Sequence, residues 1–328
     1  MRPLITLLFL SMAAPMTIRW TERPSMLRPE AGGAAGILDG ELVIAGGTSW
    51  DGDTKLWLKD VQIYEPSKKA WRSGPALPVP LAYGPFAQSA EGLEIFGGQD
   101  GAQVHREAWK LDRAKSKWLS TGTLPADVLL GRAARAGDSV FLFGGCPDTA
   151  DLTGCSDAVW RRGGNAPWRR VSTLPGGALA LPAIAVARNR IYLFGGCSMP
   201  SAGALVNRVE AYSYDPQTNE WATLRSLPHA NRGPSAVAIG DRSIYLFGGY
   251  TASPKEAAGK GASFGFSADV LVYDIEADAY TRSTPMPLPI LGVEFVTNGR
   301  ILYGAGGEDR MRGRSARLLE AQLKDPAR

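Results

Sequence analysis

The sequence predicts an all-β protein, a six-bladed β-propeller whose last blade is closed by an N-terminal strand. Glycine doublets recur 47 to 58 residues apart, each doublet ends a short apolar run, and the first five are followed by a regularly placed aromatic residue. The doublets are Gly46-Gly47, Gly97-Gly98, Gly144-Gly145, Gly195-Gly196, Gly248-Gly249 and Gly306-Gly307. A repeat of about fifty residues built from short apolar runs indicates one four-stranded blade per repeat, with the blades arranged around an axis.

Within each of the first five repeats, the aromatic residue marks the outer strand of the blade. These residues are Trp71, Trp118, Trp168, Trp221 and Tyr280, and a proline stands seven positions after each, at Pro78, Pro125, Pro175, Pro228 and Pro287. Proline suits a turn at a strand end because it cannot donate a hydrogen bond to a ladder. The pattern therefore predicts an outer strand whose ring packs between blades, followed by a turn into the next blade.

The sixth repeat lacks this aromatic residue, whereas Trp20 at the other end of the chain belongs to no repeat. We therefore expect the segment Thr17–Pro24 to supply the outer strand of the sixth blade. The other three strands of that blade are expected at Gly292–Asn298, Arg300–Ala305 and Arg317–Leu323. Pairing the two ends in this way removes exposed sheet edges.

Composition agrees with a single globular propeller and gives no sign of nucleic-acid binding. Hydrophobic residues make up 45% of the 328 residues, and 36 basic against 32 acidic residues leave a formal charge of +4. There is no dense basic run of the kind that nucleic-acid readers carry. No apolar run approaches the ~18 residues that a membrane span needs.

Residues 1–14 resemble a short signal peptide, with a basic start, an apolar run and small residues before the cleavage point. This predicts an exported protein, periplasmic or extracellular, in which residues 15–328 form the propeller. The alternative is a cytoplasmic protein that begins at Met16.

Cysteine and histidine usage leaves the redox state open and argues against a metal cofactor. Cys146 and Cys155 lie in one loop, and Cys197 repeats the position of Cys146 in the next blade. Either pairing of Cys146 is conceivable, as is a fully reduced protein. With only His105 and His229 in the chain, a histidine-rich zinc or copper site is not expected, and we predict no cofactor.

The residues directly after the six doublets should form a ring at one mouth of the propeller, because equivalent loops gather there. They are Thr48, Gln99, Cys146, Cys197, Tyr250 and Glu308, and only Glu308 is a carboxylate. A partly buried carboxyl in such a ring would have a raised pKa suited to proton transfer. The plainer interpretation is that Glu308 only forms an ion pair with an arginine of its own loop.

Residues around this mouth are candidates for ligand binding. Arg314 follows Glu308 by six positions and could hold an anionic group. Blade 1 offers an aromatic and polar loop with Trp50, Asp51 and Lys55, a combination that suits sugar rings. Further candidates at the mouth are Gln99, Arg132, Arg232 and Tyr250.

The period and doublet pattern are typical of kelch repeats, and three stretches resemble the kelch-type N-acetylneuraminate epimerase (sialic acid mutarotase) family, in its cyclically permuted branch. GGEDRMRGR is similar to a family loop of the form G-E-x5-R, which matches the spacing of Glu308 and Arg314. The segments AGGAAGILDGELVIAGGTSWDGDTKLWLKDVQIY and LPVPLAYG are similar to the family's first repeat. This likeness lies at the two ends of the chain, in the order that a circularly closed propeller would keep.

The resemblance implies an isomerase that accelerates anomer exchange of N-acetylneuraminate or a related sugar, with Glu308 as acid/base and Arg314 as carboxylate binder. The sequence departs from the family directly after two of the glycine doublets. Blade 1 has Thr48-Ser49-Trp50 there, and Asp309-Arg310-Met311 follow Glu308 in the last repeat. The alternative is a non-catalytic propeller that binds a glycan or a protein partner at the same mouth. The Gly- and Ala-rich segment 251–268 reads either as a lid or as a mobile excursion.

Overall fold

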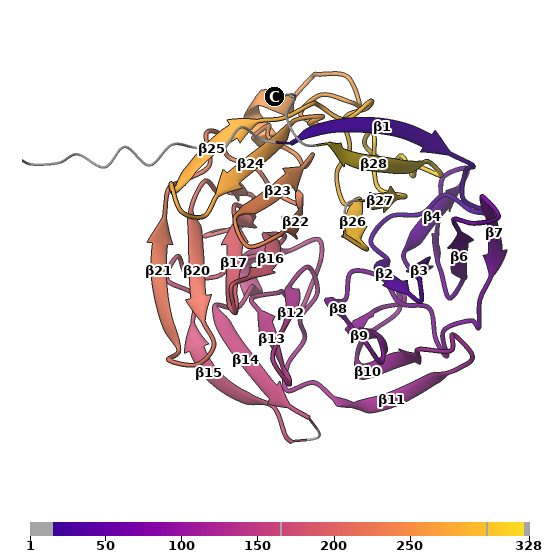
Figure 1. Ribbon diagram of the computed structural model, residues 1–328. Coiled ribbons are helices and arrows are strands. Elements are labelled where there is room, and N and C mark those ends of the chain that lie inside the picture. Colours follow the sequence, from indigo (N-terminus) through magenta and orange to yellow (C-terminus); the bar gives the residue numbers. More distant parts are fainter. Residues whose placement is uncertain (1–15, 165, 300, 325–328) are drawn as a thin grey trace, which may run out of the picture.

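The computed structural model describes residues 16–164, 166–299 and 301–324, and they form six antiparallel four-stranded sheets arranged as blades around a central channel (Figure 1). The predicted signal peptide at residues 1–14 lies outside the described residues. Within the described part of the chain, no helix is long and apolar enough to cross a lipid bilayer.

Each blade runs from an inner strand at the channel to an outer strand at the rim. Blade 1 comprises β2 (Ala34–Leu38), β3 (Glu41–Ala45), β6 (Val61–Glu65) and β7 (Ala70–Ser73). Blade 2 comprises β8 (Phe86–Ser89), β9 (Gly92–Gln99), β10 (Val104–Asp112) and β11 (Trp118–Thr123). Blade 3 comprises β12 (Arg132–Ala136), β13 (Ser139–Phe143), β14 (Ala158–Gly163) and β15 (Arg169–Thr173).

The second half of the ring repeats this arrangement. Blade 4 comprises β16 (Ala183–Ala187), β17 (Arg190–Phe194), β20 (Ala211–Asp215) and β21 (Glu220–Leu224). Blade 5 comprises β22 (Ser235–Ile239), β23 (Ser243–Phe247), β24 (Val270–Asp274) and β25 (Ala279–Arg282). Blade 6 comprises β26 (Glu294–Thr297), β27 (Ile301–Ala305), β28 (Leu318–Lys324) and β1 (Thr17–Arg23).

The loops between second and third strands carry the small remaining elements. These are the hairpin β4 (Thr48–Asp51) and β5 (Thr54–Trp57), the pair β18 (Cys197–Ser198) and β19 (Val206–Asn207), a 3-10 turn at Leu152–Gly154 and the short helix α1 (Pro254–Ala257).

The predicted closure by the N-terminal strand is confirmed. β1 pairs antiparallel with β28 over seven residues, from Thr17 opposite Lys324 to Arg23 opposite Leu318. Arg23 adds a two-pronged ion pair to the buried Glu320, with N–O distances of 2.7 and 2.9 Å. The two ends of the chain thus share one sheet, and this sheet completes the ring (Figure 1).

The hydrophobic core is divided among the seams between neighbouring blades. One cluster joins Val43 and Ile63 of blade 1 to Leu93 and Leu111 of blade 2, and corresponding clusters lie at the other five seams. A fully buried aliphatic or aromatic side chain contributes about 1.5–3 kcal/mol relative to exposure. Packing between blades therefore holds the loop ends in fixed positions around the channel.

The aromatic markers contact the preceding blade, as the sequence predicts, through a hydrogen bond in four cases and, in blade 3, through packing of Trp168 on Phe96. Trp118 of blade 2 donates to the carbonyl of Pro75, which follows the outer strand of blade 1, at 2.9 Å. Trp221 of blade 4 donates to Ser172 of blade 3 at 2.9 Å. The same relation links Trp71 to Pro24 and Tyr280 to Arg225.

The glycine doublets are required by backbone conformation and by close approach between blades. Gly46 and Gly47 have φ of +72° and +92°, and the other five doublets share this left-handed conformation. A Cβ at Gly46 would lie 2.2 Å from the carbonyl oxygen of Leu81 in the next blade. The Gly47 N–H donates to that same carbonyl at 2.8 Å, and the second glycine of every other doublet except Gly97-Gly98 donates in the same way, so these doublets tie one blade to its neighbour at the mouth.

Candidate functional site

The structure brings the six residues after the doublets into a ring, as predicted. Each forms an isolated antiparallel bridge with a residue just before an inner strand. The six pairs are Ala31–Thr48, Ala82–Gln99, Leu129–Cys146, Ala180–Cys197, Arg232–Tyr250 and Leu291–Glu308. Sequence-equivalent positions are therefore spatially equivalent, and Glu308 is the single carboxylate among the six ring residues.

Glu308 is a half-buried carboxyl held by one arginine. Its Oε1 accepts from Arg314 Nη1 at 2.8 Å, and its side chain is 23% exposed. Burial raises the pKa of Glu308 above its ordinary value. The positive charges of Arg314, Lys55 and Arg232 offset part of this rise in pKa. A carboxyl that is reachable from solvent and easier to protonate than usual is suited to accept and return protons.

Arg314 lies beneath this carboxyl and is tied to blade 1. Its Nε and Nη2 donate to Thr48 Oγ1 at 3.0 and 2.9 Å, and Nη1 donates to the Gly313 carbonyl at 2.7 Å. Nη2 also lies 3.4 Å from the Tyr83 hydroxyl. The side chain is only 5% exposed. Arg314 thus joins blade 6 to blade 1 while fixing the direction of Glu308.

Two further cations flank Glu308 from the neighbouring blades. Lys55 on β5 places Nζ 4.5 Å from the ring centre of Trp57 and 4.9 Å from that of Tyr83. Arg232, at the entry to blade 5, lies 4.2 Å over the ring of Tyr250 and donates to Asn207 Oδ1 at 2.6 Å. Burial lowers the pKa of Arg232 from its usual value.

The other predicted ligand-binding residues occupy different depths of the mouth. Trp50 is half-buried beneath Arg312 and Arg314, whose guanidinium carbons lie 5.9 and 6.0 Å from its ring centre. Asp51 is exposed at the end of β4 and has no contact with Glu308. Gln99 belongs to the ring, where its amide donates to Thr149 Oγ1 of the neighbouring loop at 2.9 Å.

Arg132 opens β12 and lies inside the channel rather than at its rim. Its Nη1 pairs with Glu294 Oε1 at 2.8 Å, and Glu294 begins β26 on the opposite side of the ring. Arg132 also lines the cavity that contains Glu308, so it remains a candidate at the mouth, with a cross-channel partner that its sequence position did not indicate.

This ion pair separates two cavities along the axis. The upper cavity, about 120 Å³, is lined by Glu308, Tyr83 and Leu291 among others. The lower cavity, about 370 Å³, is lined by residues of the inner strands, several of them alanines. Both cavities are bounded by Phe86, Arg132 and Glu294, so these side chains form the floor of the mouth.

A second carboxyl near the site, Glu30, was missed by the sequence analysis. It precedes the inner strand of blade 1, and its residue is 4% exposed. Burial raises the pKa of Glu30 to about 8, although its Oε2 accepts from the Gly33 N–H at 3.1 Å. A Cβ at Gly47 would lie 2.2 Å from this oxygen, so only glycine leaves room for the carboxyl.

The sequence did contain a signal for Glu30. The residue before each bridge partner is apolar in four other blades, at Leu81, Val128, Leu179 and Ile290, and is Asn231 in blade 5. An acidic residue in a mostly apolar column indicates an unusual buried charge, and aligning the repeats on these positions would have found it.

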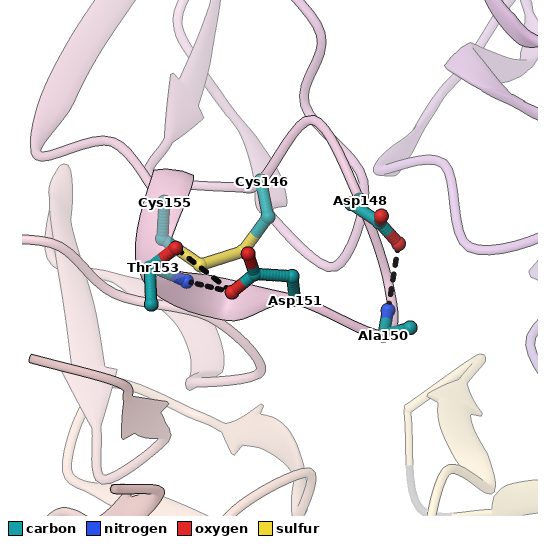
Figure 2. Close-up of a disulfide and its surroundings, with 6 residues drawn as sticks. All are labelled: Cys146, Asp148, Ala150, Asp151, Thr153 and Cys155. Atoms are coloured by element: carbon teal, nitrogen blue, oxygen red, sulfur yellow. Dashed lines mark hydrogen bonds between the residues drawn. A yellow bond between two sulfur atoms is a disulfide. The ribbon is translucent and has the colours of Figure 1, made fainter. Parts of the chain in front are cut away.

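The structure shows which of the possible cysteine pairings forms. Cys146 forms a disulfide with Cys155 within the loop of blade 3 (Figure 2). Cys197 is a buried free thiol. Asp151 stabilises this loop by accepting from the Thr153 N–H at 2.9 Å and from its hydroxyl at 2.8 Å. Burial raises the pKa of the Cys197 thiol to about 11, which makes this sulfur a poor nucleophile.

The segment 251–268 contacts the ring residue Tyr250 and the loop that carries Glu308. Helix α1 starts with a capping box between Ser253 and Glu256, and Phe266 packs edge-on against Tyr250 with ring centres 5.1 Å apart. The Met311 N–H donates to the Ala262 carbonyl at 2.9 Å, which joins this segment to the Glu308 loop. Within the described residues, no cluster of three histidine, cysteine or acidic side chains could hold a metal ion.

Comparison with known proteins supports the family resemblance over part of the chain. The family model of N-acetylneuraminate epimerase matches residues 161–259, and the Kelch motif model matches residues 31–78. N-acetylneuraminate epimerase of Haemophilus influenzae (strain PittEE) is 32% identical over 131 residues, 38% of this chain and 32% of that protein. The chain is a kelch propeller similar to the N-acetylneuraminate epimerases. The alignment spans about a third of the length of these relatives, and the residues that match the family model include neither Glu308 nor Arg314.

Other kelch proteins match longer stretches at lower identity. Beta-scruin of Limulus polyphemus is 27% identical over 73% of this chain and 26% of its own length. Kelch-like protein 36 of Mus musculus is 26% identical over 84% of this chain and 43% of its own length. The epimerase family model matches the middle of the chain, whereas the stretches that resemble this family in the sequence lie at its two ends.

Proposed function

We propose that this protein accelerates anomer interconversion of N-acetylneuraminate or a related sugar acid by acid/base catalysis at Glu308. The observation that supports the proposal most is the position of Glu308, which is the one carboxylate in the ring, with a raised pKa and a fixed arginine partner. The partial likeness to N-acetylneuraminate epimerase is consistent with that chemistry.

The reaction requires two proton transfers and no change of oxidation state. Glu308 as carboxylate takes the proton of the anomeric hydroxyl and, as the protonated acid, gives a proton to the ring oxygen while the bond between that oxygen and the anomeric carbon breaks, giving the open keto form and restoring the carboxylate. Rotation about the adjacent bond followed by the reverse transfers closes the ring with the other configuration. Positioned acid–base groups supply roughly 10²–10⁴-fold acceleration of such steps.

The residues of the mouth have separable roles in this scheme. Arg314 keeps Glu308 aimed at the cavity and favours its charged form. The half-buried rim of blade 1, with Lys55 over Trp57 and Tyr83, offers a cation and aromatic edges to a sugar ring. The ion pair of Arg132 and Glu294 forms the floor beneath the bound sugar.

The test is to dissolve crystalline α-N-acetylneuraminate in buffer and follow its relaxation to anomeric equilibrium by proton NMR. Relaxation faster in the presence of the protein than in buffer supports the enzyme. An unchanged rate, over protein concentrations that span a measured dissociation constant, contradicts it.

A second function is favoured by one specific observation. Kelch-like relatives match up to 84% of this chain, more than twice the share matched by the epimerases. On this alternative the same mouth binds a glycan or a protein without chemistry. Saturable binding of N-acetylneuraminate with no effect on anomer exchange is the result that would select this alternative.

Export to the periplasm or the cell exterior also stays a proposal, and the disulfide of Cys146 and Cys155 fits an oxidising compartment.

A further inference from the structure

Arg314, the expected carboxylate binder, has no hydrogen-bond donor left for a ligand. A guanidinium carries five N–H groups. Nε–H and one Nη2–H of Arg314 are directed at Thr48, the other Nη2–H faces the Tyr83 hydroxyl, and the two Nη1–H groups face Gly313 and Glu308. With its side chain 5% exposed, Arg314 is a positioning residue that holds Glu308.

Lys55 and Arg232 have the opposite character. Among the described residues, neither forms an ion pair with a carboxylate, and Lys55 contacts only the faces of two aromatic rings through its ammonium group. Arg232 gives one N–H to Asn207 and stacks on Tyr250. Both residues are half-buried, and a half-buried cation without a counter-charge is costly, so an anionic ligand would relieve that cost.

The two cations lie on either side of Glu308. Lys55 of blade 1 lies over Tyr83, whose hydroxyl faces the arginine that holds Glu308. Arg232, at the entry to blade 5, bridges Tyr250, the ring residue that precedes Glu308 around the mouth. The ion pair with Arg314 already balances the charge of Glu308. The positive charges of Lys55 and Arg232 therefore have no carboxylate of their own. An anion bound between them would lie beside the acid/base group, where the carboxylate attached to an anomeric carbon has to be.

We propose that Lys55 and Arg232, and not Arg314, form the anion subsite that binds the carboxylate of the sugar acid. This inference rests on the proposed function, because it assigns the substrate's charged group within the same mouth. It makes the site selective for sugars that carry a carboxylate next to the reacting carbon.

The experiment compares binding of N-acetylneuraminate and of its uncharged methyl ester by isothermal titration calorimetry. The proposal predicts that wild-type protein prefers the acid, and that Lys55→Met and Arg232→Gln each weaken acid binding at least about tenfold, as expected for loss of a charge-assisted contact. Binding of the ester should change little. Arg310→Gln is the matched control, because Arg310 is exposed at the same mouth and pairs with Asp309; it should keep the preference.

Arg314→Lys separates positioning from binding. It should preserve the preference for the acid and lower kcat for anomer exchange, whereas the Lys55 and Arg232 variants should mainly raise KM. Circular dichroism and thermal melting establish that each variant is folded.

The outcomes distinguish this inference from the proposed function. In one outcome, wild type prefers the acid, Lys55→Met and Arg232→Gln both lose this preference, and wild type does not accelerate anomer exchange. This result supports the anion subsite and contradicts the proposed enzyme activity. In another outcome, wild type accelerates anomer exchange, but the preference for the acid survives both substitutions or is lost only in Arg314→Lys. This result overturns the anion subsite and supports the enzyme activity. A wild type that binds acid and ester equally overturns the subsite directly.

Discussion

Glu30 gives the protein a pH-dependent stability that one substitution should remove. The carboxyl is 4% exposed, and burial raises its pKa from 4.5 to about 8. Between these two values the folded protein keeps the proton while the unfolded chain has lost it. The folded state therefore binds more protons, and the free energy of unfolding falls as the pH rises through this interval.

The size of the effect follows from the interval. Each pH unit within it costs about 1.4 kcal/mol of stability. From pH 5.5 to pH 7.5 the wild type should lose about 2–3 kcal/mol through Glu30 alone. Glu30→Gln keeps the shape and an oxygen that can accept from Gly33, but it cannot ionise. The stability of this variant relative to wild type should rise by that amount over the same two units.

The assay is urea denaturation of both proteins at pH 5.5, 6.5 and 7.5, followed by tryptophan fluorescence. Glu91→Gln is the control, because the Glu91 side chain is 81% exposed and lies on the surface of blade 2. The difference in free energy of unfolding between Glu91→Gln and wild type should stay constant from pH 5.5 to pH 7.5. Parallel pH profiles for wild type and Glu30→Gln would refute the conclusion that this carboxyl is buried and protonated.

Three further predictions concern the scaffold, and each is checked by chemical denaturation. Gly46→Ala should destabilise the fold by about 2 kcal/mol or more, because φ is +72° and the new Cβ would meet the Leu81 carbonyl; Gly40→Ala, which has φ of +81° but open space, should cost less. Cys155→Ser should cost about 2–3 kcal/mol by opening the short loop closed at Cys146, and reductant should destabilise wild type but not this variant. Arg23→Ala should cost about 3 kcal/mol, because it leaves Glu320 buried without its partner at the closing sheet; an unchanged midpoint would show that this strand pairing carries little of the stability.

The blade count, the closing strand and the ring of mouth residues could be predicted from sequence because a repeat converts position in the chain into position in space. Trp20 could be assigned to the last blade since it filled the one gap in a regular pattern. The same logic placed Glu308 at the mouth, where the structure finds it.

What the sequence did not reveal are contacts across seams between distant segments. Arg314 is 266 positions from Thr48, and that contact is what removes it as a ligand binder. The partner of Arg132 lies 162 positions away on the opposite side of the channel. Spacing within one loop cannot indicate which donors are already occupied by another blade, so the division of roles between Arg314, Arg232 and Lys55 required coordinates.

The measurement that tests the account most directly is anomer exchange of N-acetylneuraminate by wild type, Glu308→Gln and the neighbouring control Asp309→Asn. Proton NMR follows the decay of the freshly dissolved α anomer at equal concentrations of each folded protein. The account predicts acceleration by wild type and by Asp309→Asn, with the rate returning to that of buffer for Glu308→Gln. Acceleration that persists in Glu308→Gln would contradict the assignment of Glu308 as the acid/base group.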